Sequence, residues 1–355
     1  MKQSGRKYNR IVVKIGSSIL CSEGERIDDA VFKGIAAQIS NLVKNGTEVV
    51  IVSSGAIALG MHHLGLTDRP KELFYLQAAA AVGQTDLMNS YSRFFKDSFK
   101  TAQLLLTWED FSNHTRYLNA KNTVNTLLRL KTVPIINEND TVSTDEIKFG
   151  DNDKLSALVA SLISADLLII LSDIDGLWDA EKKVIRVVDK IDHAIKQLAC
   201  PTDKKRCVGG MITKIEAAKI AVNSGIPCLI VNGKKTAVIE DSVREPGTHG
   251  TLFVSKEGYL NEKDRWIAYG TKPKGYIFVD DGARKAILAK KSLLSVGVRC
   301  CKGTFENGDI VSLCDSFKNE FARGKAGISS KQLEKVCGQH SDKEVVHCDN
   351  IVFTE

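Results

Sequence analysis

The stretch of residues 150–178 constrains the fold more than any other part of the chain. It opens with small polar residues, and apolar residues then recur at the spacing of one helical face over residues 155–163. Residues 167–171 are five apolar residues in succession, which is typical of a strand covered on both faces of a parallel sheet. Ser172 and Asp173 follow directly. Because open α/β sheets bind ligands at the carboxyl ends of their strands, this stretch predicts a parallel sheet with a polar site at its edge.

The composition limits the classes of protein to consider. A length of 355 residues favours two domains over one. The N-terminal residues lack the apolar segment of a secretory signal, and no apolar run approaches the length of a membrane span. The nine cysteines are an odd number and lack metal-ligand spacing, so we expect free thiols, as in a reducing compartment. We therefore expect a cytosolic protein that has no membrane partner. A net charge of +6 is too small to require nucleic acid as a partner.

The alternation of strands and helices continues through residues 1–256. Small or polar residues follow several of the strands, as Gly16, Ser54 and Asn137 do. This alternation predicts an α/β fold, a three-layer sandwich around a mostly parallel sheet. The apolar runs expected as further strands are residues 10–14, 48–52, 102–106, 133–136 and 228–231, of which the last is expected to close the sheet.

Several of these residues have the chemistry that phosphoryl transfer needs. Lys14 offers a positive charge next to Gly16, and the glycine pair 209–210 precedes a helix that carries Lys214, so backbone N–H groups and a second charge are available for phosphate. No Walker A sequence is present. Candidates for holding a metal ion or a lysine pair are Asp153 and Asp173, and candidates for binding a small polar substrate are Ser54, Asn137, Asp140 and Asn152.

The length and spacing of the predicted elements change near residue 262. Short strand-like runs separated by turn residues such as Asp281-Gly282 predict a small, mostly β domain over residues 262–355. Its basic residues are interpreted as a solvated face rather than a nucleic-acid surface. They are Lys272, Lys274, Arg284, Lys285, Lys290 and Lys291.

Six segments of the chain also match a known family in their order and content. They are K-I-G-S-S (14–18), I-V-S-S-G-A-I-A-L-G (51–60), P-I-I-N-E-N-D (134–140), E-I-K-F-G-D-N-D-K-L-S-A-L-V-A (146–160), L-S-D-I-D-G-L (171–177) and G-G-M-x-T-K (209–214). This set resembles the glutamate 5-kinase family of the amino acid kinase superfamily, and the C-terminal region resembles a PUA domain. The resemblance implies ATP-dependent phosphorylation of the γ-carboxylate of L-glutamate to L-glutamyl 5-phosphate, the first step of proline biosynthesis.

The resemblance also implies roles for individual residues. Lys14 and Lys214 are expected to bind the phosphates and stabilise the transferring phosphoryl group, with Asp153 holding both lysines. Ser54, Asp140 and Asn152 are expected to bind glutamate, and Asn137 to line the same pocket. ATP is expected to bind with Mg²⁺, and no residue is assigned to the metal. The expected nucleotide-binding residues are Lys14, Ser172, Asp173, Gly209, Gly210, Met211, Ile212, Thr213 and Lys214.

Proline as a feedback inhibitor and a homo-oligomer, dimer or tetramer, are further expectations from the resemblance. Two alternatives stay open: another superfamily kinase acting on aspartate or acetylglutamate, and an RNA-binding role of the PUA-like region. The polar clusters at residues 137–140 and 150–153 argue against the first. The small basic surplus and the lack of an aromatic stacking platform argue against the second.

Overall fold

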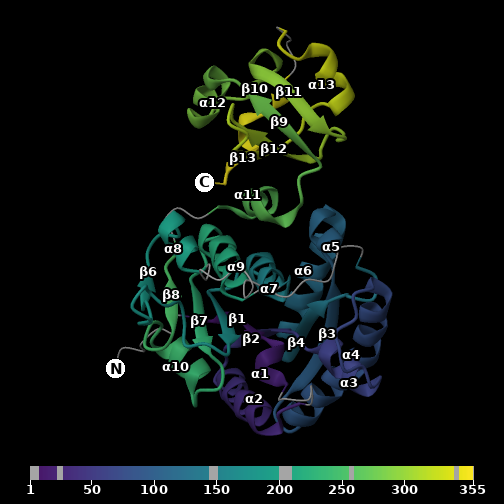
Figure 1. Ribbon diagram of the computed structural model, residues 1–355, viewed down its shortest axis with the longest axis vertical. Coiled ribbons are helices and arrows are strands. Elements are labelled where there is room, and N and C mark those ends of the chain that lie inside the picture. Colours follow the sequence, from purple (N-terminus) through teal and green to yellow (C-terminus); the bar gives the residue numbers. More distant parts are fainter. Residues whose placement is uncertain are drawn as a thin grey trace. The chain divides into compact units, whose positions relative to one another are not determined.

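The computed structural model describes residues 8–21, 27–143, 151–199, 210–255, 260–339 and 344–354. The chain divides into two compact units. The first contains Met1–Thr107 and Tyr117–Tyr259, and the second contains Trp108–Arg116 and Leu260–Glu355. Figure 1 shows the elements of each unit.

An eight-stranded sheet in the order β3-β4-β2-β1-β5-β7-β8-β6 forms the centre of the first unit. Neighbouring strands in this sheet run parallel, except that β7 and β8 are antiparallel. The prediction that residues 228–231 close the sheet was wrong, because β8 and β6 continue beyond them; both are too short to show a sequence period. The strands are β1 (Arg10–Ile15), β2 (Glu48–Ser53), β3 (Lys100–Leu106), β4 (Thr132–Glu138), β5 (Leu167–Ser172), β6 (Val187–Val188), β7 (Cys228–Asn232) and β8 (Thr251–Phe253).

Helices cover both faces of this sheet, which makes three layers as predicted. On one face, strand residues such as Ile11 and Val13 pack with α2, α4 and α10 in one buried core. On the opposite face α7 and α9 lie side by side, with α7 against β1, β2, β4 and β5 (Figure 1). The helices are α1 (Ser17–Leu20), α2 (Asp29–Lys44), α3 (Ala56–His63), α4 (Leu73–Phe95), α6 (His114–Arg129), α7 (Asp151–Leu162), α8 (His193–Leu198), α9 (Met211–Asn223) and α10 (Val238–Arg244).

Two glycines allow α3 and α4 to cross with their backbones in contact. A Cβ on Gly60 would lie 1.7 Å from the carbonyl oxygen of Ala79, and one on Gly83 would lie 1.8 Å from that of Ala56. Neither oxygen can move away, since each belongs to a helix backbone. The crossing therefore fixes the position of α4 relative to the loop from which α3 starts.

The second unit contains a five-stranded sheet in the order β11-β9-β12-β13-β15 and a separate pair, β10 with β14. Its core packs around Phe305 and Phe321. The sequence did not predict β13, because charged residues and Gly324 interrupt its apolar pattern. The strands are β9 (Gly275–Val279), β10 (Leu293–Leu294), β11 (Val298–Gly303), β12 (Ile310–Cys314), β13 (Glu320–Lys325), β14 (Glu344–Val346) and β15 (Ile351–Phe353). The helices are α5 (Trp108–Ser112), α11 (Glu262–Arg265), α12 (Asp281–Leu288) and α13 (Ser330–Val336), with a π-helical turn at Trp266–Gly270.

Residues 108–116 belong to this second unit although they follow β3 in sequence. The indole Nε1 of Trp266 donates a hydrogen bond to the carbonyl oxygen of Phe111 at 2.8 Å, and the ring of His114 packs edge-on against Trp266. Of the six basic residues noted above, Lys274 pairs with Asp309, and Lys272 and Arg284 lie over aromatic rings.

No helix in the described ranges is both long and apolar enough to cross a membrane. The seven cysteines in these ranges are free thiols.

Candidate active site

The carboxyl ends of β1, β2, β4 and β5 meet at one edge of the sheet, because these strands are parallel neighbours. The register places Ile15 beside both Ser53 and Leu171. From β1 the chain adds β2 on one side and later β5 on the other, so the strand order switches direction at β1. Open α/β sheets bind ligands at such a switch point.

A buried group of charges lies beside this edge, where side chains of β1, α7 and α9 meet. Asp153, in the first turn of α7, is 0% exposed. One of its oxygens, Oδ1, lies 2.5 Å from Nζ of Lys14, and the other, Oδ2, lies 3.2 Å from Nζ of Lys214. Thr213 Oγ1 also donates to Oδ2, at 2.8 Å. With two ammonium groups around one carboxylate, this charge cluster of Lys14, Asp153 and Lys214 is net positive and suits an anion.

Burial and charge act in opposite directions on the pKa values in the charge cluster. Burial alone would raise the pKa of Asp153, but Lys14, Lys214 and the hydrogen bonds that the carboxylate accepts hold this pKa below its usual value. Burial lowers the pKa of Lys14, Asp153 opposes that effect, and Lys214 lowers the pKa further. Asp153 is therefore ionised at neutral pH, and Lys14 loses its proton at a lower pH than an exposed lysine.

Gly16 places a residue without a side chain next to the Lys14 ammonium group. A Cβ at this position would lie 3.5 Å from Lys14 Nζ and 3.6 Å from the carbonyl oxygen of Leu171. Any longer side chain would therefore cover the charge. The lack of a side chain at Gly16 lets a ligand such as a phosphate approach Lys14 Nζ closely.

A network of amide side chains begins at the residue before Asp153. Asn152 Nδ2 donates to Ser54 Oγ and to Asn137 Oδ1, both at 3.0 Å. Asn137 Nδ2 donates in turn to Gln84 Oε1 at 2.9 Å. The structure thus brings together Ser54, Asn137 and Asn152, three of the four residues predicted to bind the substrate. We call these three residues and Gln84 the amide network.

The other predicted residues lie at the same edge or outside the described ranges. Asp140, the fourth predicted substrate residue, is in the turn that follows β4. Ser172 is buried at the end of β5, and its Oγ donates to the exposed Asp173 at 3.3 Å. Of the predicted nucleotide-binding loop, Gly209 lies outside the described residues. Gly210 is the N-cap of α9, and Met211, Ile212 and Thr213 form its first turn, ahead of Lys214.

Gln84 was not predicted as a site residue. A single glutamine in an alanine-rich helix gives no local signal, because it is equally common on a solvated face. The available signal was a seven-residue spacing, which places Gln77, Gln84 and Tyr91 on one face of α4. From that face Gln84 bonds to Asn137 in β4 and Tyr91 to Ser53 at the end of β2, whereas Gln77 bonds to Ser143, beyond the turn that follows β4.

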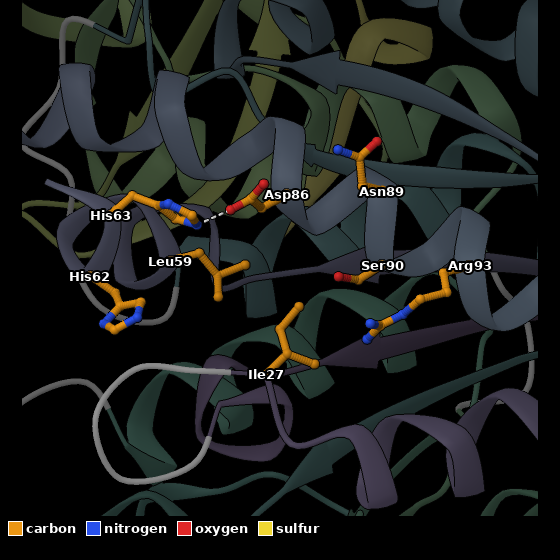
Figure 2. Close-up of a pocket in the computed structure, with 8 residues that line it drawn as sticks. All are labelled: Ile27, Leu59, His62, His63, Asp86, Asn89, Ser90 and Arg93. Carbon is orange, nitrogen blue, oxygen red and sulfur yellow. Dashed lines mark ion pairs between the residues drawn. The ribbon is translucent and has the colours of Figure 1, made fainter.

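A separate cavity of about 340 Å³ lies on the opposite face of α4, lined by residues of α3 and α4 and by Ile27. Figure 2 shows His63 and Asp86 turned toward each other in an ion pair. Arg93, another lining residue, pairs with Asp29 at 2.7 Å. None of the residues assigned above to the charge cluster or the amide network lines this cavity.

Metal-ligating side chains are not gathered in the charge cluster. Across the described ranges, one group of at least three His, Cys, Asp or Glu residues has its ligand atoms close enough to share an ion. It is His347, Cys348 and Asp349, in the second unit. Both oxygens of Asp153 are occupied by lysines and Thr213.

Comparison with known proteins agrees with this architecture. The model of the amino acid kinase family matches residues 9–232, and that of the PUA domain matches residues 275–347. A solved N-acetylglutamate synthase from Neisseria gonorrhoeae, in complex with coenzyme A and N-acetylglutamate, shares the fold with a TM-score of 0.52 at 15% identity, over 71% of this chain and 60% of that one. The fold and the matched residues define an amino acid kinase with a PUA domain, and a kinase family implies ATP as the phosphoryl donor.

Curated relatives identify which family of amino acid kinases the chain belongs to. The glutamate 5-kinases of Caldanaerobacter subterraneus subsp. tengcongensis and Thermoanaerobacter sp. are each 44% identical over 98% of both chains. That of Pelobacter propionicus is 42% identical, also over 98% of both chains. The chain therefore belongs to the glutamate 5-kinase family.

Proposed function

We propose that the chain transfers the γ-phosphoryl group of ATP to the γ-carboxylate of L-glutamate, giving L-glutamyl 5-phosphate and committing glutamate to proline biosynthesis. One observation carries this proposal. Asn152, which anchors the amide network, and Asp153, which anchors the charge cluster, are consecutive residues of α7. A substrate held by the first therefore lies next to a phosphate held by the second.

The chemistry needs charge neutralisation rather than a general base. The γ-carboxylate has an ordinary pKa of about 4.3, so it is already ionised and nucleophilic at neutral pH. One of its oxygens forms the new bond to the γ-phosphorus while the bond from that phosphorus to the β–γ bridging oxygen breaks, and ADP leaves with that electron pair. No proton moves. The barrier comes largely from bringing two anions together, which the two lysines counteract.

Each predicted residue receives a role in this scheme. Lys14 and Lys214 neutralise the transferring phosphoryl group, and Asp153 holds them at a fixed separation. Ser54, Asn137 and Asn152 hold glutamate, and Asp140 pairs with its α-ammonium group. The nucleotide is bound by Ser172, Asp173 and the residues from Gly209 to Lys214. We assign these roles to a catalytic domain of residues 1–256, followed by the PUA-like domain of residues 262–355, in a cytosolic enzyme.

Mg²⁺ fits this site as an ion carried mainly by the nucleotide. Magnesium in kinases is commonly bound by substrate phosphates with one or two carboxylates. Asp153 is committed to the lysines, whereas Asp173 is exposed at the end of β5. When bound, the ion would neutralise charge on the β- and γ-phosphates.

Trapping with hydroxylamine tests the proposed reaction. Incubation with ATP, Mg²⁺ and L-glutamate is expected to give glutamyl hydroxamate, because hydroxylamine captures the acyl phosphate. Aspartate and N-acetylglutamate are the comparison substrates. Equal or greater hydroxamate formation from either of them would replace the proposal with another amino acid kinase activity.

We also propose that proline inhibits the enzyme by binding in or beside the glutamate site. Inhibition that high glutamate concentrations do not relieve would contradict this placement. A homo-oligomer, dimer or tetramer, is proposed on the same family resemblance. Light scattering of the eluted protein measures its mass directly, and a monomer would contradict it.

A further inference from the structure

Helix α4 directs three polar side chains toward the candidate active site. Gln77, Gln84 and Tyr91 are seven residues apart and therefore share one face of the helix. Gln77 Nε2 donates to the carbonyl oxygen of Ser143 at 3.1 Å, and Tyr91 Oη donates to Ser53 Oγ at 2.8 Å. Both of these side chains thus form hydrogen bonds within the protein. Gln84 differs in that its oxygen accepts a hydrogen bond from Asn137 while its Nε2 donor has no partner in the described part of the chain.

The orientation of the amide network follows from one backbone group. The N–H of Glu138 donates to Asn137 Oδ1 at 2.9 Å, and because an N–H can only donate, it fixes which end of the Asn137 amide is the oxygen. Asn137 Nδ2 must then face Gln84 Oε1, which leaves Gln84 Nε2 as the outer group. By the same reasoning Asn152 bonds through Nδ2 and leaves Oδ1.

These two outer atoms are buried and unsatisfied. Gln84 Nε2, a donor, and Asn152 Oδ1, an acceptor, both lack a hydrogen-bond partner within the described part of the chain. Buried polar atoms are normally paired, so an unpaired donor and an unpaired acceptor in one network beside the candidate active site are available to a ligand. That ligand must offer both an acceptor and a donor.

We propose that Gln84 determines specificity for the amino-acid end of the substrate. Its Nε2 donates a hydrogen bond to the α-carboxylate, while Asn152 Oδ1 accepts one from the α-ammonium group. This assignment rests on the proposed function and deepens it, because it names the group that reads the α-carboxylate. The Gly60–Gly83 crossing holds Gln84 in place, since it fixes α4 one residue before it.

Two substitutions separate this role from a purely structural one. Gln84→Met removes both halves of the amide. Gln84→Glu keeps an oxygen that accepts from Asn137 and replaces the Nε2 donor with a second, negatively charged oxygen. We expect both variants to raise KM for glutamate, by roughly 10- to 100-fold, as loss of a hydrogen bond to a charged group does. KM for ATP should change less than about threefold.

Gln38→Met is the matched control. Gln38 is also half-buried on a helix, and its Oε1 accepts from the backbone N–H of Ile239 at 2.8 Å. Losing that bond imposes a comparable structural defect at a different helix, so KM for glutamate should stay at the wild-type value. A thermal unfolding midpoint for each variant shows that the protein measured is folded.

The outcomes distinguish this inference from the proposed function. If the wild-type protein forms no hydroxamate from glutamate, the proposed function fails. If it does, but Gln84→Glu retains the wild-type KM for glutamate, or raises KM for glutamate and ATP equally, the assignment of Gln84 is overturned while the function stands. A selective rise for glutamate in both Gln84 variants supports the assignment.

Discussion

Lys14 is the fifth residue of β1, and the two-residue period of the strand turns its side chain to the opposite face from those of its two neighbours. Val13 and Ile15 pack in the core with α2, whereas Lys14 faces α7. There it is 4% exposed beside Asp153. A buried lysine keeps its charge only beside a carboxylate. The pairing with Asp153 therefore preserves a charge that a phosphate can use.

Removing either lysine of the charge cluster should lower kcat rather than raise KM. Lys14→Ala and Lys214→Ala are each expected to reduce kcat by about 10²–10³, because each removes a charge that we propose stabilises the transferring phosphoryl group. Steady-state rates of ADP release measure this. Lys154→Ala on the same helix as Asp153, where Lys154 pairs with Glu216 at 2.6 Å, is the control and should retain the wild-type kcat. Near-wild-type turnover in either cluster variant would remove that lysine from catalysis.

The activity should decline at alkaline pH as Lys14 loses its proton. Since burial lowers its pKa, kcat is expected to fall at a pH below the ordinary lysine value of about 10.4. Asp153 raises the pKa of Lys14, so Asp153→Asn should move the decline of the residual kcat to lower pH. A pH profile of kcat for both proteins tests the sign, and a shift to higher pH would contradict the coupling.

At the scale of elements, the crossing of α3 and α4 positions the substrate side of the site. The N-cap of α3 is Gly55, which follows Ser54 directly and has a φ of 108°, in the left-handed region that favours glycine. Helix α4 carries Gln84 immediately after Gly83. The close packing of Gly60 and Gly83 therefore sets the distance between two members of the amide network.

Gly83→Ala tests this packing. The added Cβ would meet the carbonyl oxygen of Ala56 and the nitrogen of Gly60, so we expect a loss of about 1–3 kcal/mol in the free energy of unfolding together with a higher KM for glutamate. Chemical denaturation measures the first quantity. Gly34→Ala in α2, where nothing lies within 4 Å of the new Cβ, should instead stabilise by about 0.5–1 kcal/mol. Equal effects at both positions would show that packing at Gly83 is unimportant.

At the scale of the whole molecule, two units with separate cores share one chain that passes between them more than once. The segment Trp108–Arg116 leaves β3 of the first unit, packs within the second and returns in α6. Its anchor is Phe111, which is buried and whose carbonyl oxygen accepts the Trp266 hydrogen bond. The second unit is therefore more than a domain appended at the C-terminus.

Trp266→Phe should destabilise the second unit by about 1 kcal/mol, because it removes the hydrogen bond to Phe111 and keeps most of the ring. Denaturant unfolding followed by circular dichroism measures the change. Trp178→Phe is the control, since Trp178 is an exposed residue of the first unit. No difference between the two variants would mean that this bond contributes nothing to stability.

The sequence predicted elements well where a single period dominates. The run at residues 167–171 became β5, and the apolar residues at helical spacing over 155–163 lie in α7 and at its end. The sequence did not predict β8, which has three residues, or β13, where Gly324 and charged residues interrupt the apolar pattern. Short or irregular strands are specified by their neighbours in the sheet rather than by their own pattern.

By itself, the sequence determined where the polar side chains gather, because polar groups placed directly after buried parallel strands lie at the edge where those strands end. Residues 150–178 thus indicated both the sheet and its polar edge. Only the tertiary structure decided that Asp153 lies between Lys14 and Lys214, and that Gln84 joins Asn137 and Asn152. These contacts join helices and strands far apart in the chain. Their geometry depends on helix crossing and strand facing, which no local pattern encodes.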